Sequence, residues 1–289
     1  MYYSLRTARN VTMQTSESGA ADSWPSSGRT VIVAAGRPGM FPYHDENETQ
    51  RFPLVTVVLI ALNAAAWVWL QGAGTDLPLA KSVCELGLIP AELMASMPVG
   101  SSFQLGDGIQ CLTDPGRQPW NVLTSIFMHG SWMHLLGNMW FLWLFGNNVE
   151  DAMTRPRYLA FYLLCGVVAA LAQVATNPTS VVPMVGASGA ISGVMGAYLI
   201  LYPRIRVFTV IWLGFIFTRV ALPAWVMLLY WAFIQLASGV TTIDGDGGGV
   251  AFWAHIGGFA AGAVLVRLLV RPDHLAEHRT QQWKPQQAS

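Results

Sequence analysis

The sequence predicts an all-α polytopic membrane protein with six transmembrane helices and a long outer loop between the first two. Of its 289 residues, 53% are hydrophobic and only 11% are charged, against about 25% charged residues in soluble domains. Several apolar runs approach the roughly 20 residues that a membrane helix needs. The net charge is zero, which gives no indication of a nucleic-acid partner. The expected surroundings are a lipid bilayer.

The chain divides into a membrane domain and two polar tails. Residues 1–50 are rich in Ser, Gly, Asp and Asn without periodicity, so they predict a disordered cytoplasmic tail. Their first part has no apolar core of a secretory signal peptide. Residues 51–271 contain the apolar runs and form the expected six-helix domain. Residues 272–289 are polar and predict a second cytoplasmic tail.

Six apolar runs predict the helices in order. The first precedes the outer loop, which extends from Gln71 to about Gly130. The second ends at Glu150 and Asp151, and the fourth stops before Pro203, because proline disfavours helical geometry in the residue ahead of it. The runs are residues 52–70, 133–151, 157–176, 188–202, 223–239 and 252–270.

Residues 207–220 are also apolar and raise the alternative of a seventh helix. Their β-branched side chains, together with Gly214 and Arg219, favour a partly inserted connection instead. The sequence therefore predicts six spans.

The distribution of Lys and Arg predicts the orientation. If the N-terminus is inside, fourteen of the sixteen Lys and Arg residues lie on the inner side, with Lys81 and Arg117 as the exceptions. Short loops rich in Lys and Arg stay in the cytoplasm. We therefore expect a multi-pass protein of the inner (plasma) membrane with both termini in the cytoplasm.

The fourth helix is too short to cross the whole membrane. From Ser188 to Tyr202 it covers about 22 Å, whereas the hydrocarbon core is about 30 Å thick. Ser188 therefore lies roughly 8 Å below the outer boundary, and the connection before it dips into the membrane. Irregular backbone at that depth needs cover from protein or a water-filled cavity. The sequence thus predicts a wet cavity open to the outer side.

Four polar residues from three helices share that depth. By helical rise, His255 and His134 lie about 5 Å below the outer boundary and Asn138 about 10 Å below it. His134 and Asn138 are four residues apart and share one face. Taken alone, each residue has a structural explanation in packing or interhelical hydrogen bonding. Together with Ser188 they indicate a functional site, because ionisable side chains inside a membrane are costly.

The cluster contains the groups that acyl transfer needs. Ser188 is the candidate nucleophile and His255 its base, and the lack of an acid at this depth predicts a dyad. Backbone N–H groups at the start of the fourth helix, with His134 and Asn138, are candidate donors to an oxyanion. Small residues would let the fourth and sixth helices approach closely. They are Gly189, Gly193, Gly196, Gly258 and Gly262.

Metal binding is the competing use of the histidines. The spacing of His129 and His134 is unusual for two ligands on one helix, and no Cys, Asp or Glu joins them at that depth. We therefore expect no metal and no other cofactor.

These motifs resemble those of the rhomboid family of intramembrane serine proteases, over roughly residues 40–271. HGSWMHLLGN resembles the family's motif on the second helix, here His129, His134 and Asn138. GASG, from Gly186 to Gly189, resembles the motif around the nucleophile, and AHIGGFAAG resembles the motif around the base. GLIP and FGNNVED are typical of bacterial members.

The resemblance implies cofactor-free hydrolysis of peptide bonds in or near the spanning segment of single-pass membrane proteins. It implies a Ser188–His255 dyad that acts through an acyl-enzyme, and an oxyanion hole of Ser188 N–H, His134 and Asn138. It also implies substrate entry near a mobile fifth helix. His129 would be structural and hold the long loop in place.

Two positions depart from the family pattern. Many members have Trp-Arg in the first loop, where this chain has Trp120 and Asn121. Some members have an aromatic residue four positions after the nucleophile that stacks on the base, and this chain has Ser192 there. Neither change removes a chemical role, but the sequence does not show what holds the ring of His255.

The resemblance also bears on where the protein begins. MFPYHDENETQRFPLVT resembles the start of bacterial members, so Met40 is expected to be the initiator, with residues 1–39 untranslated or dispensable.

Cys84 and Cys111 share the outer loop, where disulfides persist, and are expected to pair. Cys165 is expected to pack within the third helix.

Two other functions compete with proteolysis. A catalytically silent relative would bind membrane helices without cutting them, but such proteins usually lack the serine or the histidine. A transporter or channel would more naturally show acidic residues or inverted repeats at mid-membrane, and neither is visible.

Overall fold

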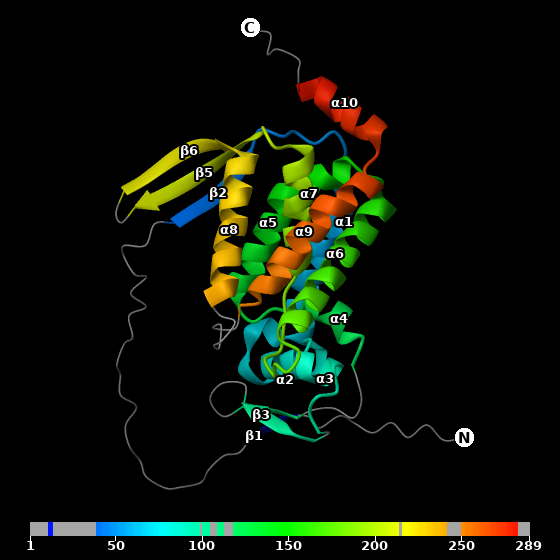
Figure 1. Cartoon of the computed structure of the whole chain (residues 1–289), viewed down its shortest axis with the longest axis vertical. Coiled ribbons are helices and arrows are strands. Elements are labelled where there is room, and N and C mark those ends of the chain that lie inside the picture. The colour runs from blue at the N-terminus through cyan, green and yellow to red at the C-terminus, as the bar shows by residue number, and fades with distance from the viewer. Residues whose placement is uncertain are drawn as a thin grey trace, which may run out of the picture.

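Long helices lie side by side in the computed structural model and form the body of the molecule (Figure 1). The structure describes residues 11–13, 39–98, 100–104, 109–112, 118–213, 216–241 and 250–282. All six predicted runs are helical, with bounds that differ from the expected ones by at most two residues. The helices are α1 (Leu54–Ala65), continued by a π-helical turn (Ala66–Leu70), α5 (Trp132–Asp151), α6 (Arg155–Thr176), α7 (Ser188–Leu201), α8 (Ala224–Thr241) and α9 (Phe252–Leu269).

Three of these helices, α6, α8 and α9, are long and apolar enough to cross a membrane. The segments Leu54–Leu70 and α7 are apolar but shorter. The chain is therefore a multi-pass membrane protein, and the full number of six spans stays a prediction.

The segment 207–220 is neither a helix nor an irregular connection. It forms strands β5 (Arg206–Leu213) and β6 (Ile216–Pro223), and β5 also pairs with β2 (Gly39–Asp45) in an antiparallel sheet of order β2-β5-β6. β-branched and aromatic side chains favour strands, and strand pairing satisfies the backbone groups that a loop would leave open. The prediction of a purely α-helical fold was wrong here, and Gly214 lies outside the described residues.

The predicted disordered tail 1–50 was wrong for residues 11–13 and 39–50. β2 is paired along its length with β5, and the backbone N–H of Gln50 donates to the carboxylate of Asp151 at 2.8 Å. Residues 11–13 form strand β1, while residues 1–10 and 14–38 lie outside the described part of the chain.

The C-terminal segment is partly helical, where a polar tail was predicted. Helix α10 (Pro272–Gln282) follows α9 directly, and the N–H of Arg271 donates to the carbonyl of Ala152 at 2.9 Å. Residues 283–289 lie outside the described residues. In Figure 1, α10 and the β2-β5-β6 sheet lie at one end of the bundle.

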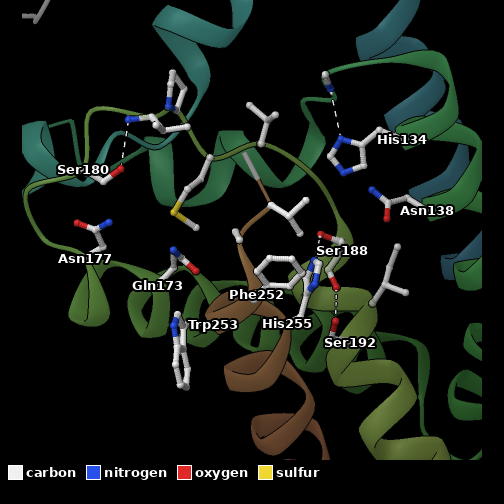
Figure 2. A pocket seen from close by; sticks show the side chains of 18 of the residues that line it. His134, Asn138, Gln173, Asn177, Ser180, Ser188, Ser192, Phe252, Trp253 and His255 are labelled. Carbon is white, nitrogen blue, oxygen red and sulfur yellow. Dashed lines mark hydrogen bonds between the residues drawn. The ribbon is translucent and has the colours of Figure 1, made fainter. Parts of the chain in front are cut away.

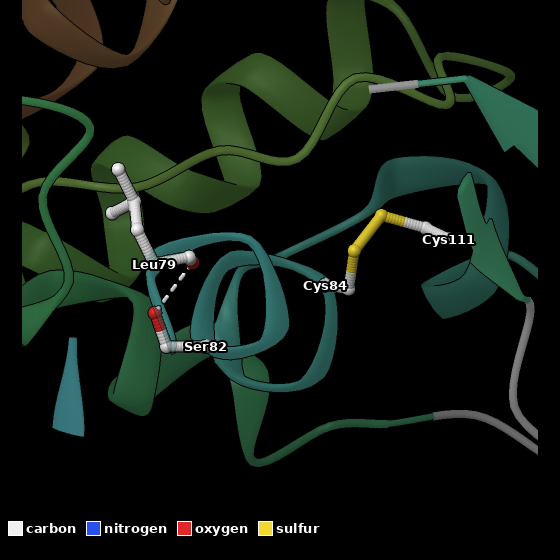
Figure 3. The surroundings of a disulfide bond; sticks show 4 residues. All are labelled: Leu79, Ser82, Cys84 and Cys111. Carbon is white, nitrogen blue, oxygen red and sulfur yellow. Dashed lines mark hydrogen bonds between the residues drawn. A yellow bond between two sulfur atoms is a disulfide. The ribbon is translucent and has the colours of Figure 1, made fainter. Parts of the chain in front are cut away.

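The outer loop has its own structure at the opposite end of the bundle (Figure 1). Cys84 on α2 and Cys111 on β4 form a disulfide across 27 residues (Figure 3), which links the helical part of the loop to β4. This strand lies between β3 of the loop and β1 of the N-terminal segment in a sheet of order β1-β4-β3. The elements of the loop are a 3₁₀ turn (Gly72–Gly74), α2 (Asp76–Leu86), α3 (Pro90–Leu93), β3 (Ser102–Gln104), β4 (Ile109–Leu112), α4 (Asn121–Thr124) and a second 3₁₀ turn (Ser125–Phe127).

Helices α7 and α9 pack with their backbones in contact. A Cβ on Gly258 would lie 2.0 Å from the carbonyl oxygen of Gly189, and one on Gly262 would lie 1.8 Å from that of Gly193. A Cβ on Gly196 would lie 2.1 Å from the carbonyl oxygen of Phe259. Small residues at these positions are what permits the approach, and this approach sets the separation of the two helices that carry Ser188 and His255.

Candidate active site

Ser188 is the first residue of α7, as its sequence position predicted. Gly186, two residues earlier, has a φ of +126°, a conformation that residues with a side chain rarely adopt. A Cβ there would lie 2.7 Å from Nε2 of His134 and 3.6 Å from Nδ2 of Asn138. Glycine therefore fits this position both for its backbone and for the space that it leaves for α5.

The irregular connection before Ser188 is hydrogen-bonded to the outer loop and to the segment after α4. Leu88 and Met184 exchange two backbone hydrogen bonds of 3.0 and 2.8 Å. The N–H of Gly186 donates to the carbonyl of Ser125 at 2.9 Å. These hydrogen bonds satisfy part of the polar backbone of this connection. A segment that dips into the membrane, as the sequence predicts here, needs such partners. The GLIP motif, which contains Leu88, is therefore paired with the connection before Ser188.

Ser188 and His255 are hydrogen-bonded, with 2.8 Å between Oγ and Nε2 (Figure 2). On the other side of the ring, Nδ1 of His255 lies 2.7 Å from Oε1 of Gln235 on α8. An amide oxygen can only accept, so Nδ1 carries the ring proton. The lone pair of Nε2 is then free to accept the hydroxyl proton of Ser188, which is the arrangement that a general base needs.

His134 and Asn138 lie beside Ser188 and line the same cavity (Figure 2). The N–H of Gly130 donates to Nδ1 of His134 at 3.4 Å, so Nε2 carries the proton and points to the chain at Gly186. Nδ2 of Asn138 donates to Nε2 of His129 at 3.0 Å, which uses one of its two protons. Each side chain thus retains an N–H that can serve an oxyanion.

His129 connects this corner of the site to the start of the outer loop. Its backbone N–H donates to Oε1 of Gln71 at 2.8 Å, and its carbonyl accepts from Nε2 of Gln71 at 2.7 Å. Its ring contacts that of His134, with centroids 5.1 Å apart. Burial lowers the pKa of His129 to about 3, so the ring is neutral at physiological pH and can accept the proton of Asn138.

Ser192 is hydrogen-bonded within its own helix. Its hydroxyl donates to the carbonyl of Ser188 at 2.6 Å, one turn back along α7. The aromatic neighbour of His255 comes instead from α8, where the ring of Trp231 lies 6.0 Å from the imidazole, centroid to centroid. Trp231 also packs on Phe259 at 5.9 Å. The ring of His255 is therefore held from α8.

A cavity of about 840 Å³ contains the site. Residues from the outer loop, from the connection before α7 and from the start of α9 line it together with the Ser–His pair (Figure 2). Among the lining residues are His134, Asn138, Gln173, Ser188, Trp231 and His255. Among the described residues, no group of three His, Cys, Asp or Glu side chains could hold a metal ion.

Sequence reasoning missed two glutamines. Gln235 is bonded to His255, and Oε1 of Gln173 accepts the backbone N–H of Ala254 at 3.2 Å, which satisfies a free donor at the start of α9. Both are uncharged polar residues within apolar helices. That feature was visible in the sequence, but their partners lie 20 and 81 residues away and could not be assigned without the fold.

The fold and the site define a class: a multi-pass helical membrane protein with a serine–histidine pair inside its bundle. Residues 116–272 match the rhomboid domain, which is more than half of the chain. The chain belongs to the rhomboid family.

Curated relatives of the chain carry rhomboid names. It is 39% identical over 80 residues to the rhomboid protease GluP of Bacillus subtilis, which covers 28% of this chain and 15% of that protein. It is 27% identical over 192 residues to RHOMBOID-like protein 5 of Arabidopsis thaliana, covering 63% of this chain and 57% of the relative. A third match, 31% over 128 residues, is to the human mitochondrial presenilin-associated rhomboid-like protein, covering 40% and 33%. The chain thus spans less than two thirds of each of these relatives.

Proposed function

We propose that this protein is an intramembrane serine endopeptidase that cleaves single-pass membrane proteins in or near their spanning segment. The observation that carries the proposal is the 2.8 Å hydrogen bond between Ser188 and His255 at the wall of a cavity. Membership of a family with protease-named relatives supports it.

Acylation follows from the protonation states of the pair. Nε2 of His255 takes the hydroxyl proton of Ser188 while Oγ attacks the carbonyl carbon of the scissile bond. The same imidazolium then gives its proton to the departing amine, which leaves an acyl-enzyme on Ser188. Water from the cavity repeats the sequence with His255 as base, releases the acid and restores the serine. No cofactor enters either half.

The oxyanion of each tetrahedral intermediate needs donors that are already in place. We assign this role to the backbone N–H of Ser188, Nε2–H of His134 and the remaining N–H of Asn138. The first lies at the N-terminus of α7, where backbone donors lack helical partners and the helix dipole is positive. The contacts of Gly130 and His129 support the orientation of the other two.

The substrate class follows from the location of the pair within apolar helices. We expect a substrate helix to enter beside α8, where nine of the 18 residues are exposed and would face lipid. We also expect the site to open to the outer side. The short-loop residues Arg155, Arg157, Arg204 and Arg206 support this, since they lie away from Ser188 at the C-terminal end of α7 or beyond α5 and would be cytoplasmic.

The test is cleavage of a generic single-pass membrane protein in liposomes, together with labelling by a serine-reactive fluorophosphonate. Wild type should cleave and label, and Ser188→Ala and His255→Ala should do neither. Ser82→Ala and His274→Ala are matched controls outside the site and should behave as wild type.

Each outcome separates the alternatives. Equal cleavage by wild type and both site variants would assign the activity to a contaminant or another nucleophile. Labelling of wild type without cleavage would indicate a narrow substrate preference. If wild type neither cleaves nor labels, the chain is a silent relative that binds membrane helices, and the proposal is wrong.

A further inference from the structure

The base of the Ser–His pair is held by a helix that carries neither member of the pair. Trp231 and Gln235 are four residues apart on α8, so they occupy one face of that helix. Both contact His255: Gln235 through the 2.7 Å bond to Nδ1 and Trp231 through its ring. Helix α9 presents His255 and Phe259 with the same spacing, and Trp231 packs on both rings.

We propose that Gln235 is a positioning residue that holds His255 in the tautomer with the proton on Nδ1 and the lone pair of Nε2 directed at Ser188. This inference rests on the proposed function. Gln235 does not touch the reacting atoms. It acts through the imidazole, in the place that a carboxylate occupies in a Ser–His–Asp triad.

The physical need for such an acceptor is clear from the surroundings. A buried N–H without a partner is costly, and an imidazole that lacks an acceptor at Nδ1 can move its proton to Nε2 or rotate. Either change removes the lone pair that Ser188 needs. Along the side of the ring that faces α8, the neighbours with contacts to it are Trp231, whose ring offers no acceptor oxygen, and Gln235, which does.

A neutral amide suits this position better than an acid would in an apolar site. A carboxylate would have to be ionised to hold the imidazolium strongly, and a buried charge carries a large desolvation cost. The amide oxygen accepts the same proton without that cost. Among the residues that the structure describes, the hydrogen bonds to the ring of His255 come from Gln235 and Ser188, so the base is oriented by an amide.

The experiment compares wild type with Gln235→Leu, Gln235→Glu and Val264→Ala in liposomes. Leu removes the acceptor at similar volume, Glu restores an acceptor oxygen, and Val264 is 61% exposed on α9, away from the helix beside which the substrate is expected to enter. The readouts are the rate of fluorophosphonate labelling, kcat and KM for a single-pass substrate, and the melting temperature. If Gln235→Leu yields too little folded protein, Gln235→Met replaces it.

We expect Gln235→Leu to lower kcat and the labelling rate by about 10- to 100-fold, part of the 10²–10⁴ that a positioned base contributes. In Gln235→Leu, KM and melting temperature should change little. Gln235→Glu should recover most of the rate but melt at a lower temperature, because its carboxylate is desolvated, and Val264→Ala should match wild type. Wild-type rates in Gln235→Leu, or a Glu variant as slow as the Leu variant, would overturn the inference while the proposed function stands. An inert wild type would overturn both.

Discussion

Gly186 illustrates how one missing side chain shapes the candidate oxyanion hole. Its φ is positive, and a Cβ at this position would lie 2.7 Å from Nε2 of His134. A larger residue would strain the backbone just before Ser188 and displace the ring that is expected to donate to the oxyanion. The GASG motif therefore has a physical reason for its first glycine that is separate from helix packing.

We predict that Gly186→Ala lowers kcat about as much as His134→Ala does. Loss of one oxyanion donor costs about 10²–10³ in rate, and both substitutions would remove the same donor. In a double-mutant cycle the two effects should therefore overlap instead of adding. Initial rates in liposomes measure this, and fully additive losses would show that Gly186 acts elsewhere.

Asn138 gives a second prediction at this scale. Asn138→Ala removes an expected oxyanion donor and also the partner of His129. Acyl-enzyme formation should slow by about 10²-fold, while KM stays near the wild-type value because the donor acts in the transition state. A rise in KM with unchanged kcat would instead assign Asn138 to substrate binding.

Helices α7 and α9 form the packed centre of the bundle, and their glycines decide whether the Ser–His pair can meet. At Gly262 a Cβ would lie 1.8 Å from a backbone oxygen of α7, so the clash cannot be relieved by turning a side chain. The helices would have to separate, and Ser188 and His255 with them.

We predict that Gly262→Ala destabilises the protein by about 1–3 kcal/mol or more, the usual cost of overpacking. Fluorophosphonate labelling should be lost at the same time. The matched control is Val264→Ala on the same helix, where the side chain is 61% exposed. Thermal unfolding in detergent checks the first effect, and normal labelling by Gly262→Ala would contradict the second.

The outer loop is stabilised as a unit by its disulfide. The chain has three cysteines, and Cys165 is the buried free one. We predict that a denatured sample without reductant shows one reactive thiol and a reduced sample shows three. Three reactive thiols without reductant would argue against the Cys84–Cys111 bridge in the purified protein.

At the scale of the whole molecule, strand β2 joins the N-terminal segment to the bundle through a buried carboxyl. Asp45 accepts hydrogen bonds from Tyr198 on α7 at 2.5 Å and from Asn148 on α5 at 3.0 Å. Burial nonetheless raises the pKa of Asp45 to about 6. The folded protein therefore keeps this proton at pH values where the unfolded chain has released it.

We predict that this carboxyl makes stability depend on pH. Its stabilising contribution is fully present below about pH 4 and is lost as the pH rises to about 6, with a size of roughly 2–3 kcal/mol at about 1.4 kcal/mol per pKa unit. Asp45→Asn cannot titrate, so its melting temperature should fall less between pH 4 and pH 6 than that of wild type. Parallel curves for the two proteins would contradict the assignment.

Much of the fold could be predicted because its signals are local. Each apolar run reports on its own helix, and Pro203 sets the end of α7 wherever that helix packs. The motif residues were equally accessible, because His134 and Asn138 share a face by spacing alone. The strands β5 and β6 were missed, because an apolar run does not distinguish a helix from a hairpin until its pairing partner, β2, is known.

The sequence by itself thus determined the positions of the helices and named the candidate residues Ser188, His255, His134 and Asn138, while the depth of Ser188 stays a prediction. Only the tertiary structure decided that Gln235 bonds the base, that Gly186 lies against His134, and that β2 pairs with β5. The physical reason is the same in each case. These contacts join residues from different elements, and their geometry depends on how whole helices pack, which local propensity and periodicity do not encode.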